Sequence, residues 1–113
     1  MKAPLKICIL LLVVCFASIS AAVAEERPVF LLTIKDHKFE PATLELPAGV
    51  KVELHVKNAD ATPEEFESVE LNREKVISAG QEGRIYIGPL QPGTYNFFGD
   101  FNPATARGKF IVK

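Results

Sequence analysis

The chain has 113 residues, and its 13 basic and 14 acidic side chains leave a formal net charge of −1 at pH 7. This length provides one hydrophobic core and excludes a second domain of ordinary size. The slightly acidic balance argues against a nucleic-acid-binding protein, whose surface needs an excess of Lys and Arg.

The first 24 residues have the features of a cleaved signal peptide. Lys2 and Lys6 form a positive start, residues 7–19 are an apolar run, and Ala22-Val23-Ala24 is a small-residue cleavage site. The apolar run is short for a membrane span. We therefore predict a periplasmic or secreted protein with no membrane span after cleavage.

The predicted mature domain, residues 25–113, contains no sulfur-bearing side chain. Cys8, Cys15 and Met1 all lie in the leader, so no disulfide forms within the domain and its core alone must stabilise it. Two of the 13 basic residues also lie in the leader, which leaves 11 against 14 acidic residues and a net charge of −3. That charge suits a cationic ligand or a basic partner surface.

The first half of this domain alternates as β-strands do. Residues 29–35 predict a strand with two fairly apolar faces, and residues 36–41 interrupt the pattern with charge and a proline. A short strand follows at residues 44–46 and ends at the turn Pro47-Ala48-Gly49. Residues 50–57 predict the clearest strand. Its inward-pointing side chains are Val50, Val52, Leu54 and Val56.

The second half is less regular. An acidic segment, residues 64–70, resumes extended structure after a loop. Residues 75–77 fit a short strand, whereas Asn72 fits the cap of one helical turn instead, so both alternatives stay open. A turn at residues 79–83 precedes a strand around Ile85.

The chain closes with two strands joined by a polar loop. Tyr95, Phe97 and Gly99 share one face of the incoming strand. Residues 90–95 match the tyrosine corner of β-sandwiches, in which the phenol bonds to an upstream backbone group. With about seven short strands and no long helix, we predict an all-β, single-domain, Greek-key β-sandwich.

The closing hairpin resembles that of the cupredoxins, the small copper-carrying β-sandwiches. Their pattern runs Tyr-x-Phe-x-Cys, then His, then Met, then Gly and a final strand, and residues 95–99 and 108–112 fit this frame. By this alignment Gly99 replaces the cysteine, Asn102 the histidine and Ala106 the methionine.

The upstream ligand position is changed as well. Cupredoxins place a histidine in a Pro-His-Asn/Glu-aromatic context, and in Pro63-Glu64-Glu65-Phe66 the residue at that place is Glu64. A type I copper site needs a thiolate and two imidazoles, and the mature domain has no cysteine. We therefore predict a cupredoxin-like scaffold without a type I copper site.

Carboxylates near these positions favour a hard, oxygen-rich metal site instead. Strand alternation puts Glu64 on the side of Phe66, toward the end of the sandwich, and the next two glutamates on the other side. The predicted ligands are His37, Glu64, Glu65, Glu67 and Asp100. Such oxygen ligands suit Fe²⁺, Mn²⁺ or Ca²⁺ better than copper, although an added imidazole admits Cu²⁺.

Each predicted ligand also has an interpretation without metal. His37 fits an exposed turn, the acidic run fits a solvated strand edge that blocks aggregation, and Asp100 and Asn102 fit the caps of a turn. His55 fits a surface position without a role. No nucleophile elbow, phosphate loop, zinc-spacing pair or catalytic triad is visible, so the residues favour a protein that is not an autonomous enzyme.

Residues 29–113 also resemble one branch of the family, the stand-alone periplasmic cupredoxin-like proteins related to the cupredoxin domain of the elemental-iron uptake component. The shared motifs include Asp-His-Lys-Phe-Glu-Pro at 36–41 and Glu-Glu-Phe-Glu-Ser at 64–68. The resemblance implies Fe²⁺ or Cu²⁺ binding and help with ferrous-iron oxidation or delivery. It implies two partners, a periplasmic metal-binding protein and the inner-membrane iron permease. Asn102 departs from the branch, in which a histidine is expected.

Two hypotheses follow for the function. The first is a metal-binding protein of a ferrous-iron uptake system. The second is a metal-free β-sandwich that docks an exported partner through its loops, and the replaced ligand positions Gly99, Asn102 and Ala106 motivate it.

Overall fold

The computed structural model describes residues 13–17 and 26–113. The predicted cleavage site and most of the predicted signal peptide lie outside the described residues. Residues 13–17 are exposed and have no regular secondary structure. Within the described part, no helix is long and apolar enough to cross a membrane.

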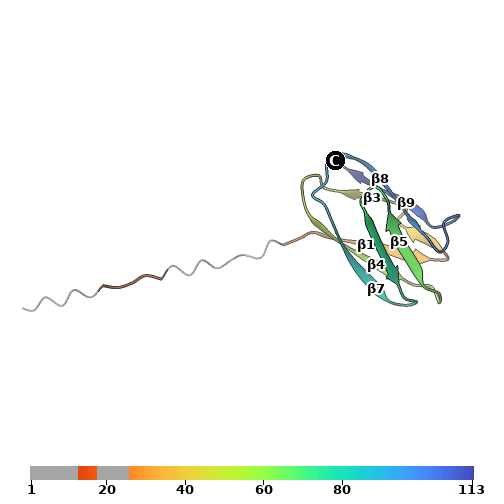
Figure 1. Cartoon of the computed structure of the whole chain (residues 1–113), viewed down its shortest axis with the longest axis horizontal. Coiled ribbons are helices and arrows are strands. Elements are labelled where there is room, and N and C mark those ends of the chain that lie inside the picture. Colours follow the sequence, from red (N-terminus) through yellow and green to blue (C-terminus); the bar gives the residue numbers. More distant parts are fainter. Residues whose placement is uncertain (1–12, 18–25) are drawn as a thin grey trace, which may run out of the picture.

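Residues 29–112 form an all-β sandwich of two sheets, as predicted (Figure 1). The strands are β1 Val29–Lys35, β2 Lys38–Glu40, β3 Thr43–Leu46, β4 Val52–Asn58, β5 Glu64–Ser68, β6 Arg73–Ile77, β7 Glu82–Ile87, β8 Gly93–Gly99 and β9 Arg107–Val112. One sheet has the order β2-β1-β4-β7 and the other the order β3-β9-β8-β5-β6. The pairs β1–β4 and β3–β9 are parallel, and the other neighbours are antiparallel.

Residues 26–113 form nine strands rather than about seven because two short strands join the sheet edges. The strand β6 settles the alternatives left open for residues 75–77 in favour of a strand, and Asn72 lies in the preceding turn with φ of 52°. The prediction for Val50 was wrong. This side chain is 40% exposed and precedes β4, so the inward alternation begins at Val52.

The strand β2 arises from a tight hairpin that the sequence pattern did not reveal. Lys35 pairs with Lys38 across a two-residue loop, in which Asp36 and His37 have φ of 52° and 56°. Two positive φ values are the signature of a type I′ turn. The backbone N–H groups of both loop residues donate to the carboxylate of Asp60, over 2.8 and 3.0 Å.

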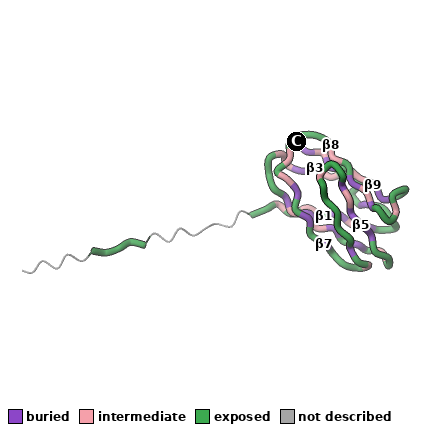
Figure 2. Tube along the Cα trace, viewed as in Figure 1, coloured by how far each residue is buried: buried purple, intermediate pink, exposed green. Residues whose placement is uncertain are grey.

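The core lies between the sheets, where the buried positions of the strands gather (Figure 2). It contains a cluster of aromatic rings. Phe97 packs edge-on against Phe39 at 5.0 Å between ring centroids, stacks on Phe66 at 5.3 Å and tilts against Phe110 at 4.5 Å. Gly108 makes room for this ring, because a Cβ at this position would clash with the Phe97 ring. The same Cβ would lie 2.7 Å from the carbonyl oxygen of Ala42. The cluster joins β8 to β2, β5 and β9.

The tyrosine corner is confirmed. The Tyr95 hydroxyl donates to the carbonyl oxygen of Gln91 over 2.8 Å. This bond fixes the entry to β8, the strand that leads into the loop of residues 100–106.

Candidate metal centre

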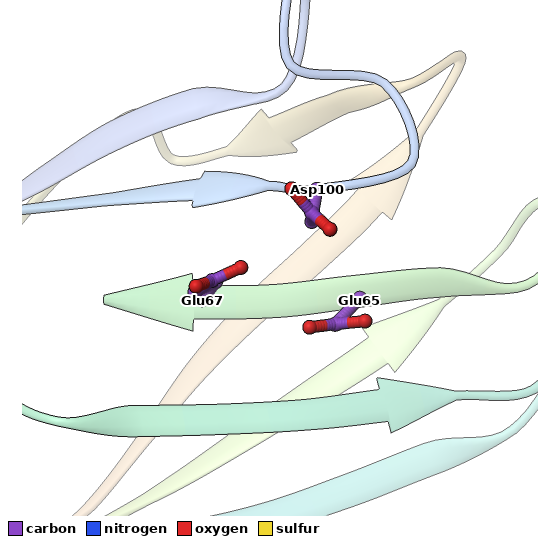
Figure 3. A group of neighbouring side chains, drawn as sticks. All are labelled: Glu65, Glu67 and Asp100. Atoms are coloured by element: carbon purple, nitrogen blue, oxygen red, sulfur yellow. The ribbon is translucent and has the colours of Figure 1, made fainter. Parts of the chain in front are cut away.

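Three of the predicted ligands come together on the outer face of the second sheet. Glu65 and Glu67 alternate with the buried ring of Phe66 along β5, so both carboxylates point away from the core. Asp100 follows directly after β8, the neighbouring strand. One ligand oxygen from each of the three carboxylates lies within 4.8 Å of the others (Figure 3).

The sheet itself holds Asp100 beside the two glutamates. Phe66 pairs with Gly99, and Glu67 pairs with Phe98. One residue further on, the backbone N–H of Asp100 donates to the carbonyl oxygen of Glu65 over 2.9 Å. The three carboxylates therefore stand on backbone that ladder hydrogen bonds hold in place.

A fourth carboxylate, Glu74, adjoins this group from β6, where it pairs with Glu67. A hydrogen bond with Glu74 raises the pKa of Glu65 from 4.5 to about 7, and burial and the charges of Glu74, Asp100 and Glu67 add to the shift. Burial, followed by the charges of Asp100 and Glu74, also raises the pKa of Glu67. The hydrogen bond with Glu74, burial and the neighbouring negative charges thus all favour the protonated form of Glu65, and burial and the neighbouring charges favour that of Glu67.

No basic side chain neutralises the group within the described residues: none of the ion pairs formed by residues 26–113 involves Glu65, Glu67 or Asp100. Three crowded carboxylates, with the pKa of Glu65 and of Glu67 raised, match the ligand chemistry of a hard divalent cation. Such an ion would displace the shared proton and remove the repulsion.

Glu64 lies on the opposite side of β5 and is 1% exposed. Its carboxylate accepts hydrogen bonds from the backbone N–H groups of Glu65 at 3.0 Å and Phe101 at 2.9 Å. It also accepts one from Nδ2 of Asn102 at 2.7 Å. Alternation along the strand correctly separated Glu64 from Glu65 and Glu67.

The structure also gathers the four positions that the resemblance maps onto copper ligands. Asn102 is hydrogen-bonded to Glu64, and a Cβ on Gly99 would lie 2.6 Å from Cδ of Glu64 and 2.7 Å from Cβ of Ala106. Glu64 offers a carboxylate at these positions and Asn102 an amide. Ala106 offers only a methyl group, and Gly99 only a hydrogen. They contain no thiolate and no imidazole, so they do not fit a type I copper ion.

His37 is not part of the carboxylate group. Its imidazole Nδ1 lies 3.6 Å from Oδ2 of Asp60, in the hairpin turn of the other sheet. The backbone N–H of His37 lowers the pKa of Asp60, as do the N–H of Asp36 and the imidazole charge, and burial opposes them. His37 therefore belongs to the turn, with Asp60 as its partner.

His55 has more contacts than a surface side chain without a role. Its imidazole is 16% exposed and lies between Glu82, 2.9 Å from Nδ1, and Glu53, 3.4 Å from Nε2. Both carboxylates come from the sheet that contains His55, one from β4 and one from β7. These contacts stabilise the outer face of the first sheet, away from the three-carboxylate group.

Sequence reasoning missed one neighbour of the three-carboxylate group, Glu74, and it missed the hydrogen bond that Asn102 donates to Glu64 on the other side of β5. The dense acidic run between residues 64 and 74 was visible, but the β5–β6 register that places Glu74 opposite Glu67 was not. Asn102 was interpreted as a lost ligand, whereas it donates to Glu64.

The raised pKa of Glu65 predicts a pH dependence for the metal-free protein. Between pH 4.5 and about 7 the folded protein holds a proton that the unfolded chain releases, so the free energy of unfolding falls as pH rises through this window. Urea titrations between pH 4.5 and 8 measure it. In Glu65→Gln this component is absent, and equal pH slopes for the variant and the wild type would contradict the assignment.

Comparison with known proteins places the chain among copper-related folds. The family model described as a cupredoxin-like domain matches residues 8–112. The uncharacterized protein RP394 of Rickettsia prowazekii (strain Madrid E) is 49% identical over 81 residues, which are 72% of this chain and 65% of that protein. The chain thus spans less than two thirds of that relative's length.

Two solved structures illustrate the similarity of fold. The metal-binding domain of the Cu(I)-exporting P-type ATPase CopA of Streptococcus pneumoniae D39 superposes with a TM-score of 0.68 at 18% identity, over 80% of this chain and 91% of that domain. Auracyanin A, a blue copper protein of Chloroflexus aurantiacus, gives 0.67 at 13% identity, over 78% of this chain and 100% of that one. At such identities the comparison shows the fold.

Proposed function

This chain belongs to the family of cupredoxin-like domains, and we propose that it binds a divalent metal ion, Fe²⁺ first, on the outer face of its second sheet. Glu65, Glu67 and Asp100 are the proposed ligands. The observation that supports this function most strongly is the mutual approach of their oxygens within 4.8 Å.

The donor set supports iron over copper. Carboxylate oxygens are hard ligands that Fe²⁺, Mn²⁺ and Ca²⁺ accept, whereas copper gains most from imidazole and thiolate. His37 lies against Asp60 instead of joining the carboxylates, so the group offers oxygen alone. Cu²⁺ is the second choice for this reason.

The biological role that we propose is ferrous-iron handling outside the cytoplasm. The resemblance to the branch related to the elemental-iron uptake component supports this role. In it the protein delivers Fe²⁺, or assists its oxidation, beside a periplasmic metal-binding partner and a high-affinity iron permease of the inner membrane. Three carboxylates that range from the buried Glu65 to the exposed Asp100 suit a carrier, because so few protein ligands bind an ion and release it again.

A second candidate is a metal-free module that docks an exported partner through the loop after β8. Phe101, at 48% exposure, is the observation that favours it. An aromatic side chain beside acidic groups suits a partner surface that is basic and partly apolar. In that case the acidic group would complement charge rather than hold an ion.

Anaerobic titration calorimetry of residues 25–113 with Fe²⁺, repeated with Cu²⁺, tests the proposal. We expect saturable one-site binding of Fe²⁺ near micromolar affinity, about −8 kcal/mol. Binding should weaken below pH 7, where the proton on Glu65 competes with the ion. If neither metal produced a measurable heat of binding, the result would refute metal binding and favour the docking module.

A further inference from the structure

The buried carboxylate of Glu64 is the feature that the proposed metal site does not use. It is 1% exposed and lies among the positions that correspond to copper ligands. An ionised group at such depth is costly unless hydrogen bonds or a counter-ion compensate for lost water. The described residues give Glu64 no ion-pair partner, so its hydrogen bonds must supply that compensation.

In all three of these hydrogen bonds Glu64 is the acceptor. The N–H of Glu65 and the N–H of Phe101 share Oε1, and Nδ2 of Asn102 donates to Oε2. A carboxylate has about four lone-pair positions, so most of its accepting capacity is used. The positive ends of three N–H dipoles converge on this point, which suits an anion and opposes a bound cation.

The chain around the carboxylate is shaped to it. Gly99 is required here because a Cβ would meet Cδ and Oε1 of Glu64 at 2.6 and 2.8 Å. The N–H of Gly99 donates to the carbonyl oxygen of Ala106 over 2.8 Å and closes the loop at its base. Glu64 then bonds to the loop at Phe101 and Asn102, just beyond Asp100.

We propose that the Glu64 carboxylate takes the structural place of a metal ion, as an internal anion that ties the loop of residues 100–106 to β5. The copper-ligand positions are thereby closed to a metal, and Glu64 is a positioning residue rather than a ligand. This inference stands apart from cation binding on the outer face, because it concerns the metal-free protein.

Removal of the carboxylate provides the first test. In Glu64→Ala three donors lose their acceptor, so we expect Tm to fall by about 10 °C or more. Acetate has the atoms that this substitution removes. Sodium acetate should therefore raise the Tm of Glu64→Ala and leave the wild type unchanged, whereas acetamide and sodium chloride should have no such effect. Glu40→Gln, at an exposed position of β2, is the control for the loss of one negative charge.

A donor exchange provides a second test that does not depend on the alanine variant folding. In Glu64→Gln one terminal atom becomes a donor that faces Nδ2 of Asn102. The double variant Glu64→Gln/Asn102→Asp restores a donor–acceptor pair, so it should recover at least half of the Tm lost by the single variant.

Hydrogen exchange of metal-free protein reports on the loop directly. The amide of Phe101 should exchange about tenfold faster or more in Glu64→Gln than in wild type, and return toward wild type in the double variant. Unchanged exchange and Tm in Glu64→Gln, or an alanine variant that folds and gains nothing from acetate, would overturn the proposal. Fe²⁺ binding by the wild type is measured separately, so failure of either idea is distinguishable.

Discussion

Replacing Phe97 with alanine lowers the free energy of unfolding by about 3–5 kcal/mol, the cost of a large cavity in a close-packed core. The ring is 1% exposed and contacts the rings of Phe39, Phe66 and Phe110. These rings come from both sheets, whose backbones are held by strand pairing, so the neighbours fill the space only in part. For a domain of this size the change corresponds to a fall in Tm of roughly 12–40 °C.

Urea unfolding measures this effect, and Phe101→Ala is its matched control. Phe101 is 48% exposed, so the same deletion should cost far less, within about 1 kcal/mol. If the two variants were equally stable, the aromatic cluster would not be the centre of the fold.

Neutralising Glu65 and Glu67 together, as Glu65→Gln/Glu67→Gln, should reduce Fe²⁺ affinity by about 100-fold or more, roughly 2.7 kcal/mol of binding free energy. Two of the three proposed ligands then lose their charge, while the backbone that supports them is unchanged. The same variant should unfold at a higher temperature than the wild type in the absence of metal at pH 7–8. We expect this higher unfolding temperature because the variant lacks the crowded negative charges that help to raise the pKa of both glutamates.

The control for charge alone is Glu40→Gln/Glu45→Gln, which neutralises two exposed carboxylates on β2 and β3. It should keep wild-type Fe²⁺ affinity. Equal losses in both double variants would mean that net charge attracts the ion, and that no specific ligands do.

The strand β5 places carboxylates in two chemically different environments within three residues. On the inner side, Glu64 receives three N–H donors and no counter-ion. On the outer side, the neighbours of Glu65 and Glu67 are other carboxylates. The first environment stabilises a negative charge and the second opposes it, so an added cation gains most on the outer side.

Period-two alternation made this arrangement partly predictable. It located β1, β4 and β8, put Phe97 on the same face as Tyr95 and Gly99, and separated Glu64 from its two neighbours. The type I′ turn at Asp36-His37 was hidden because neither residue is the glycine that usually marks positive φ. Val50 was misplaced because the pattern gives the period of a strand and not its first residue.

The side-chain partners depended on long-range geometry that no local pattern contains. Asp60 accepts from the backbone of Asp36, 24 residues away, and that contact keeps His37 at the turn. Asn102 donates to Glu64 across 38 residues. Glu74 joins the carboxylates only through the register of β5 with β6. These pairings exist because neighbouring strands within each sheet bring distant segments of the chain together.

Localising a paramagnetic ion tests the central claim most directly. Mn²⁺, a hard cation that prefers oxygen ligands, is titrated into ¹⁵N-labelled metal-free protein while backbone amide signals are followed by NMR. The account predicts that the amides of Glu65, Glu67, Asp100 and the adjoining Glu74 broaden first and saturably, and that the Asp36-His37 turn keeps sharp signals. Broadening centred on His37 or His55, or spread evenly over the acidic surface, would contradict a metal centre on the outer face of β5.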